Sequence, residues 1–251
     1  MVRLGGMQAL TGLIGLALVL SACGDQKPGV TEPSAAPSAI APPNAKLAML
    51  AVFPDAVNGE VAIPASGGAL ARVERPVTVI AGEAGRFYLV KAKEVTAGCH
   101  ACSASVSVYY LRDTNGALSL SAPYRDLYES GGWGEAGEIT ALTLPRNGGV
   151  GMTDESGFTA QGCTVTNVSV YRFDESGPKD ILDRAPLGRS QDAIDIGGTV
   201  IRPYTPDTDF AINYSGNANS VPIDATVMWT MENGVLVQSS GMIPEAVASG
   251  C

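Results

Sequence analysis

The sequence predicts an all-β protein built from repeated antiparallel hairpins that follow a Pro- and Ala-rich tether. Three observations lead to this prediction. Gly and Pro, the residues of tight turns, supply 30 and 16 of the 251 residues. Short runs of Val, Ile, Thr and Tyr alternate with small or polar residues, and Gly, Asn or Asp bounds each run. The hydrophobic content of 45% is too high for a chain that stays disordered.

The first 22 residues are expected to be a lipoprotein signal peptide. Arg3 precedes an apolar run over residues 10–20, which is too short to cross a bilayer core of about 30 Å. The run ends in Leu20-Ser21-Ala22-Cys23, which resembles the lipobox of bacterial lipoproteins. That resemblance implies that Cys23 is acylated and anchors the mature chain to the lipid bilayer, because several acyl chains bind a membrane stably.

Two further expectations concern where the anchored protein lies and how far it reaches. Gly24 stands where Gram-negative sorting rules place an Asp to retain a lipoprotein, so the resemblance implies the outer membrane, facing the periplasm. Residues 23–46, rich in Pro, Ala and Ser, are expected to be the acylated Cys and a disordered tether. Residues 47–251 are then the β-rich domain, long enough to bury a sizeable core.

The strands are expected within four runs: Phe87–Lys91, Ser103–Leu111, Thr164–Phe173 and Ala225–Met231. No stretch of twelve residues has a convincing apolar period of 3.6, so helix content should be low.

Four tight turns follow aromatic-bearing strands and predict hairpins, because such turns require positive φ. Each strand is named with its turn: Val52-Phe53 with Asn58-Gly59, Tyr109-Tyr110 with Asn115-Gly116, Tyr171 with Ser176-Gly177, and Trp229 with Asn233-Gly234. The turn glycines lie 57, 61 and 57 residues apart. This spacing predicts repeated meanders, arranged either as a propeller-like fold or as a β-sandwich.

The four remaining cysteines, Cys99, Cys102, Cys163 and Cys251, predict two disulfides in an oxidising compartment. Three pairings are possible. A tight turn after Gly98 would bring Cys99 and Cys102 within the Cα separation of about 4.4–6.8 Å that a bridge requires. That pairing is favoured and leaves Cys163 with Cys251.

Other chemistry at Cys99-His100-Ala101-Cys102 is disfavoured. A redox dithiol needs a helix N-terminus or a positive charge to lower a thiol pKa, and this motif leads directly into a strand. Ser103 stands where covalent haem attachment requires a His, and no second cluster completes a zinc or copper site. His100 is the one His of the chain and no Gly-x-Ser-x-Gly motif accompanies it. We therefore expect no metal site and no cofactor.

The function predicted is that of a non-catalytic binding or structural module of the envelope, with an unknown envelope protein or glycan as its ligand. Trp133 in the Gly-rich segment 131–137 is the candidate ligand-binding residue, with Tyr124 and Tyr128 as companions. The net charge of −9 argues against nucleic-acid binding, which needs clustered positive charge.

An envelope hydrolase acting on glycan or peptide is the alternative function. Asp113, Asp154 and Asp174 each begin an Asp-x-x-Gly segment that is expected to be a turn. None of these segments has the spacing of an EF-hand calcium loop. Two of the carboxyl groups at a suitable separation would suffice for glycoside hydrolysis.

A family resemblance rests on Gly98-Cys99-His100-Ala101-Cys102, Gly132-Trp133-Gly134 and Gln161-Gly162. Together these motifs resemble a group of uncharacterised proteobacterial envelope proteins with a Cys-His-x-Cys turn, a Gly-x-Trp-Gly loop and a Gln-Gly pair. The likeness spans residues 75–185. It implies a shared β-domain and an envelope location, and no activity.

Overall fold

The computed structural model describes residues 42–144, 149–201 and 208–251. The expected signal peptide, Cys23 and the tether up to residue 41 lie outside the described residues. The described elements are α1 (Ala45–Val52), β1 (Val61–Ile63), β2 (Arg72–Ala81), β3 (Arg86–Val95), β4 (Ala104–Thr114), β5 (Ala117–Ser130), β6 (Glu138–Leu144), β7 (Gly149–Ala160), β8 (Cys163–Asp174), β9 (Gly177–Gln191), β10 (Ile194–Ile201), β11 (Phe210–Ala218), β12 (Val221–Glu232), β13 (Val235–Ser240) and α2 (Glu245–Ala248).

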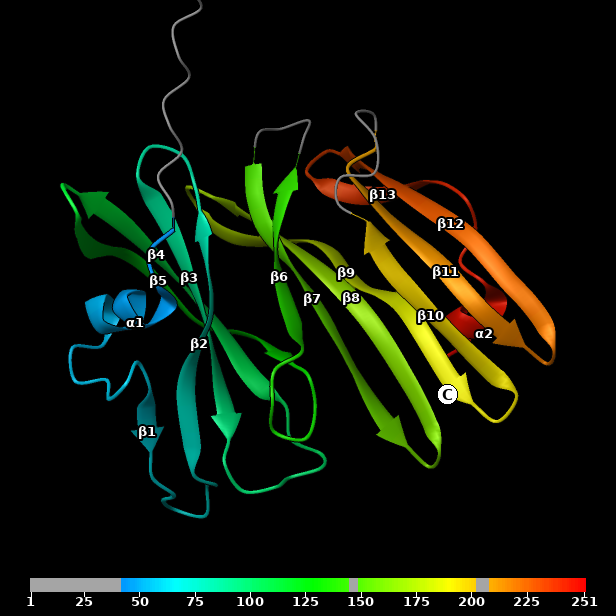
Figure 1. Ribbon diagram of the computed structural model, residues 1–251, viewed down its shortest axis with the longest axis horizontal. Helices are drawn as coiled ribbons and strands as arrows, with labels where there is room; N and C mark the ends of the chain where they lie inside the picture. Colours follow the sequence, from blue (N-terminus) through cyan, green and yellow to red (C-terminus); the bar gives the residue numbers. More distant parts are fainter. Residues whose placement is uncertain (1–41, 145–148, 202–207) are drawn as a thin grey trace, which may run out of the picture. The chain divides into compact units, whose positions relative to one another are not determined.

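The strands form two antiparallel meander sheets, so the all-β prediction is confirmed (Figure 1). One sheet has the order β1-β2-β3-β4-β5, and the other has the order β13-β12-β11-β10-β9-β8-β7-β6. Within each sheet, strands that are consecutive in the sequence pair with each other, as hairpin connections dictate. Two sheets in the described part of the chain are fewer than the four or more blades of a propeller.

Three of the four expected hairpins are present. The turns at Asn115-Gly116, Ser176-Gly177 and Asn233-Gly234 join β4 to β5, β8 to β9 and β12 to β13. In the first and third of these turns both central residues have positive φ, 57° and 85° at Asn115-Gly116 and 51° and 89° at Asn233-Gly234. This is the type I′ geometry whose twist matches that of the flanking strands.

The first expected hairpin strand is wrong, because Val52 ends helix α1. Asn44 caps this helix by accepting a hydrogen bond from the backbone N–H of Lys46 at 2.8 Å. Ala48 and Met49 of this helix are fully buried against β3 and β4. The helix begins two residues before Leu47, the expected start of the domain.

Ring contacts between the sheets place β5 beside β8. The ring centroids of Tyr88 on β3 and Phe173 on β8 are 4.8 Å apart. The rings of Tyr128 on β5 and Tyr171 on β8 are stacked, with a centroid distance of 4.4 Å and an interplanar angle of 13°. These residues belong to one buried cluster with side chains from both sheets. The space beside the Tyr128–Tyr171 pair is therefore bordered by both sheets.

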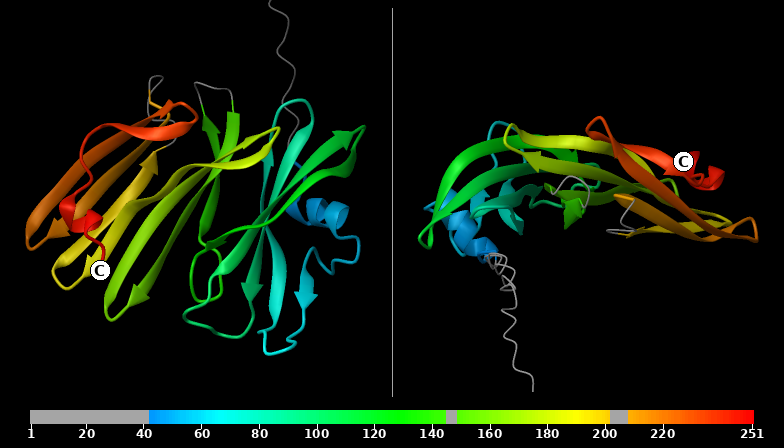
Figure 2. Two further views of the ribbon diagram at one scale, coloured as in Figure 1. Left: turned by 180° about the vertical axis from the view of Figure 1, so that it is seen from behind. Right: turned by 90° about the horizontal axis from the view of Figure 1, so that it is seen from above.

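The larger sheet has its own core, which α2 covers on one side (Figure 2). Val247 of α2 is buried in this core, and Arg189 Nη1 on β9 donates a hydrogen bond to the carbonyl oxygen of Ala246 at 3.1 Å. These contacts dock the C-terminal helix onto β9.

Both disulfides have the favoured pairing. The Cα atoms of Cys99 and Cys102 are 5.3 Å apart, and those of Cys163 and Cys251 are 5.9 Å apart. Since Cys163 opens β8, the second bridge ties Cys251 to the β7–β8 hairpin.

Candidate functional site

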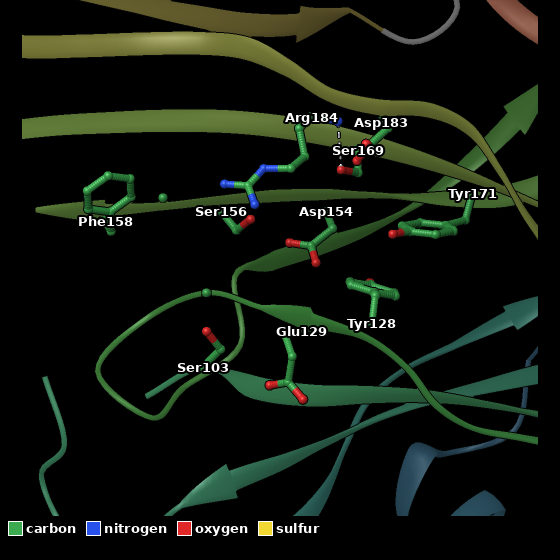
Figure 3. A pocket seen from close by; sticks show the side chains of 12 residues that line it. Ser103, Tyr128, Glu129, Asp154, Ser156, Phe158, Ser169, Tyr171, Asp183 and Arg184 are labelled. Atoms are coloured by element: carbon green, nitrogen blue, oxygen red, sulfur yellow. Dashed lines mark hydrogen bonds between the residues drawn. The ribbon is translucent and has the colours of Figure 1, made fainter. Parts of the chain in front are cut away.

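A cleft of about 510 Å³ lies between β5 of the smaller sheet and β7, β8 and β9 of the larger one (Figure 3). Its volume is in the range of small-molecule sites. The aromatic side chains that line it are Tyr128, Phe158 and Tyr171, and the charged ones are Glu129, Asp154, Asp183 and Arg184. The cleft thus combines ring faces with charged groups.

An irregularity in strand pairing brings the β9 residues to the cleft. The register of β8 against β9 shifts between Val168 and Val170, and Arg184 has a φ of 46°. The backbone N–H of Arg184 donates a hydrogen bond to Ser169 Oγ at 3.1 Å (Figure 3). Bulges of this kind re-aim side chains, and here the bulge places Asp183 and Arg184 at the cleft.

Asp154 lies within strand β7, so the prediction that it begins a turn is wrong. It pairs with Ile139 of β6 on one side and with Ser169 of β8 on the other. Gly157, which suggested the turn, lies instead where β7 and β8 are too close for a side chain, because a Cβ there would lie 2.2 Å from the carbonyl oxygen of Val165. The Asp154 side chain is consequently buried, with 2% of its residue surface exposed.

The carboxyl group of Asp154 is incompletely satisfied. Its Oδ1 atom is buried and makes no hydrogen bond of acceptable geometry with the described residues, although the hydroxyls of Ser130 and Tyr128 lie beside the carboxyl. Burial raises the pKa of Asp154, and the two hydroxyls oppose that shift only in part. Figure 3 shows the carboxyl directed into the cleft. Buried polar atoms without a hydrogen-bond partner are uncommon in folded proteins, so the burial of the Asp154 carboxyl requires an explanation.

The two stacked tyrosines stay neutral. Burial, together with the nearby charge of Asp154, raises the pKa of Tyr128 well above its ordinary value. Burial also raises the pKa of Tyr171, with further contributions from Asp180, Asp154 and Asp183. The Tyr128 hydroxyl is itself buried and lies beside the Asp154 carboxyl. The ring pair therefore presents phenol groups and not phenolates.

Lys91 is a second buried ionisable residue, and in contrast to Asp154 it has an ion-pair partner among the described residues. Lys91 on β3 is 1% exposed, and its Nζ lies 2.7 Å from Glu74 Oε1. The same Nζ is 5.7 Å and 5.8 Å from the ring centroids of Phe53 and Tyr109. Burial lowers the pKa of Lys91, opposed by Glu74. Here the chain supplies the carboxylate, the rings and the cation.

Of the three residues predicted to form a ligand site, Tyr128 is among the residues that line the cleft, and Trp133 and Tyr124 are not. Trp133 is 52% exposed in a tight turn, with a φ of 61°, and its ring centroid lies 3.8 Å from that of His100. Tyr124 packs against Tyr110 at 4.9 Å and is not among the residues that line the cleft.

The other two acids of the hydrolase hypothesis lie in turns, as predicted, and are engaged there. Asp113 Oδ1 accepts a hydrogen bond from the backbone N–H of Gly116 at 2.6 Å. Asp174 accepts from the N–H and hydroxyl of Ser176 and pairs with Lys179 at 2.9 Å. Despite the opposing effect of burial, these partners lower the pKa of Asp174 to about 2. Neither carboxyl lines the cleft.

Glu129, Asp183 and Arg184 of the cleft were missed in the sequence because no local motif marks them. A period of two in β7 would have indicated Asp154, since it lies two residues after the buried Met152 and so shares its face. The aromatic residue Tyr171 was recognised only as part of a hairpin strand.

Within residues 42–144, 149–201 and 208–251, no three His, Cys, Asp or Glu side chains are grouped in a way that could hold a metal ion. No helix in the same ranges has the length and apolar character needed to cross a membrane. Comparison of the chain with protein-family models, with curated proteins and with solved structures finds no match.

Proposed function

We propose that this protein is a lipid-anchored binding module of the bacterial cell envelope and that its ligand binds in the cleft at Asp154. The anchor rests on residues 20–23, which resemble a lipobox. The observation that carries the binding function is the buried carboxyl of Asp154, whose Oδ1 has no partner among the described residues, at the wall of a cleft of about 510 Å³. An ionised carboxyl that is buried without a partner of opposite charge is costly, and a ligand that pairs with the carboxyl from the cleft offsets that cost.

The wall of the cleft supports recognition of a polar ligand with an apolar part. The stacked rings of Tyr128 and Tyr171 form a stiff aromatic wall, and Phe158, 49% exposed, adds a third ring. Convergent polar groups on an aromatic wall are the usual composition of small-molecule sites.

Hydrolysis of a glycan or peptide is the second candidate function, and the raised pKa of Asp154 favours it. A raised pKa favours the protonated form of a buried carboxyl, which is the form that acts as a general acid, and Glu129 in the same cleft supplies a second carboxyl. In this form the hypothesis uses Asp154 and Glu129, and the turn residues Asp113 and Asp174 have no part in it.

The anchor is tested by replacing Cys23 with Ala and separating the envelope into soluble and membrane fractions. The variant should appear in the soluble periplasmic fraction, whereas the wild type should need detergent for extraction. A variant that remains in the membrane fraction would disprove the lipid anchor.

Ligand binding is tested by thermal unfolding of the domain with separated envelope glycan and peptide fractions, since a ligand of the native state raises Tm. The active fraction should lose its effect on Asp154→Asn and keep it on Asp113→Asn, which removes the same charge outside the cleft. Identical behaviour of the two variants, or no effect of any fraction on the wild type, would refute the assignment of the cleft.

Turnover separates the two candidate functions. Peptidoglycan fragments and generic glycoside and ester substrates are incubated with the wild type and with the Asp154→Asn, Asp113→Asn and Asp174→Asn variants. Product formation that only Asp154→Asn abolishes would establish the hydrolase. A ligand that shifts Tm and remains chemically unchanged would establish the binding module.

A further inference from the structure

We infer that the group recognised in this cleft is a cation, an alkylammonium, and that Asp154 is the carboxyl that pairs with it. The inference rests on the proposed function, because it takes the cleft to be the ligand site and names the chemistry of the ligand. It follows from three features: the charges around the cleft, the unsatisfied state of Asp154, and a matching arrangement elsewhere in the same chain.

The charges at the cleft are predominantly negative. Three carboxyl groups line it, from Glu129, Asp154 and Asp183, against the single guanidinium of Arg184. The carboxyl of Asp180 also acts on the tyrosine pair, because it contributes to the raised pKa values of both rings. A recess lined by one sign of charge concentrates ions of the opposite sign, and the net charge of −9 acts in the same direction.

An acidic lining is common on protein surfaces, and the state of Asp154 makes this one different. Glu129, Asp183 and Arg184 are exposed and solvated, whereas Asp154 is 2% exposed and has a buried Oδ1 without a hydrogen-bond partner in the described structure. A buried carboxylate is stabilised most strongly by an opposite charge in direct contact. The chain brings no Lys or Arg to Asp154 among the ion pairs of the described residues.

The Lys91 site shows the complete form of the same arrangement. There a carboxylate, Glu74, contacts the buried ammonium, and two aromatic rings lie within 6 Å of the nitrogen. The cleft has a carboxyl, Asp154, beside two aromatic rings, Tyr128 and Tyr171, and no Lys or Arg forms an ion pair with that carboxyl among the described residues. A ligand ammonium would take the position that the Lys91 side chain fills in its own site.

The direction in which Arg184→Ala changes the affinity for a ligand distinguishes a cationic ligand from an anionic one. Its exposed guanidinium repels a bound cation, so Arg184→Ala should tighten the binding of a cationic ligand. For an anionic or zwitterionic ligand, Arg184 would be the attractive partner and the same substitution would weaken binding. Because Arg184 is exposed, its replacement leaves the core unchanged.

Binding of a cation should also depend on pH. The ionised form of Asp154 pairs with the cation, so binding releases a proton from any molecules in which the raised pKa keeps Asp154 neutral. Affinity is therefore expected to increase as pH rises through the pKa of Asp154. The other titratable or charged groups that face this carboxyl or the adjoining ring pair are Tyr128 and Glu129 of β5, Tyr171 of β8, and Asp180, Asp183 and Arg184 of β9.

The experiment is calorimetric titration of the lipid-free domain with two cationic probes, spermidine and Nα-acetyl-lysine amide. N-acetylglucosamine and glutamate serve as the neutral and anionic comparisons. At least one cation should bind, Asp154→Asn should lose about tenfold or more in affinity, and Arg184→Ala should gain several-fold. Asp113→Asn is the matched control for the loss of one negative charge and should bind like the wild type. Binding of spermidine alone indicates a free polyamine, and binding of the lysine amide indicates a peptide side chain.

Three results would overturn the inference: no binding of either cation, equal binding by Asp154→Asn and the wild type, or weaker cation binding by Arg184→Ala. Unfolding curves confirm that each variant is folded before it is titrated. If neither cation binds while an envelope fraction still raises Tm in an Asp154-dependent way, the cationic ligand is refuted and the binding function stands. If no fraction and no cation has any effect, both proposals fail.

Discussion

Opening the bridge between Cys163 and Cys251 is expected to destabilise the domain strongly. The two cysteines are 88 residues apart, and the chain entropy released by opening a loop of this length corresponds to about 4.6 kcal/mol. Cys251→Ser is the appropriate substitution because Cys251 is exposed, whereas Cys163 is buried. In a domain of this size about 1 kcal/mol shifts Tm by about 2–4 °C, so Tm should fall by about 9–18 °C.

The control is the bridge between Cys99 and Cys102, which are separated by three positions. Replacing both with Ser removes a much smaller loop and should cost about 2 kcal/mol by the same relation. Both variants are unfolded with urea under non-reducing conditions, and their free energies of unfolding are compared with that of the wild type. Equal losses in the two variants, or a larger loss at the short loop, would refute the loop-entropy reasoning.

Three further changes follow from the packing. Trp133→Ala should lower the free energy of unfolding by no more than about 1.5 kcal/mol, mainly through lost ring stacking, because Trp133 is 52% exposed. Trp229→Ala, at a residue that is 3% exposed, should lower it by about 3–5 kcal/mol. A large fall in Tm for Trp133→Ala would place Trp133 in the core. Asp154→Asn should stabilise the protein increasingly as pH rises above about 4. The reason is that the pKa of Asp154 is higher in the folded than in the unfolded state, so the wild type loses stability as pH rises above the unfolded-state pKa. Urea unfolding of both proteins at pH 4 and pH 7 checks this, and a difference in stability between variant and wild type that is equal at both pH values would contradict it. Gly137→Ala should destabilise the protein by about 1–3 kcal/mol, because the new Cβ would lie 2.5 Å from a carbonyl oxygen of β7. A Cβ at Gly98 would meet no atom within 4 Å, so Gly98→Ala should leave the stability unchanged in the same unfolding assay.

Much of the fold could be predicted because its signals are local. Alternation over Ser103–Leu111 and Thr164–Phe173 indicated β4 and β8, since the side-chain period of a strand is two. The Asn115-Gly116 turn indicated its hairpin, because only a few residue types accept positive φ at low cost. The disulfides followed from the separation of four cysteines and the geometry of a tight turn.

The errors arose where a local signal had two physical explanations. Gly157 suggested a turn, yet it is a glycine because β7 and β8 approach too closely there for a Cβ. Val52-Phe53 suggested a strand, yet the cap at Asn44 and the burial of Met49 form a helix over the same stretch. In both places contacts outside the short motif decided between the two.

The sequence by itself determined the β-class, the hairpin turns and the favoured cysteine pairing, because these depend on the conformational preferences of a few consecutive residues. The candidate site was decided only by the tertiary structure. Tyr128, Asp154, Tyr171 and Arg184 come from four different strands, and they meet because the two meanders share a core at the β5–β8 ring contact. Burial is likewise a property of the assembled sheets, so the raised pKa and the unsatisfied carboxyl of Asp154 have no counterpart in the local sequence.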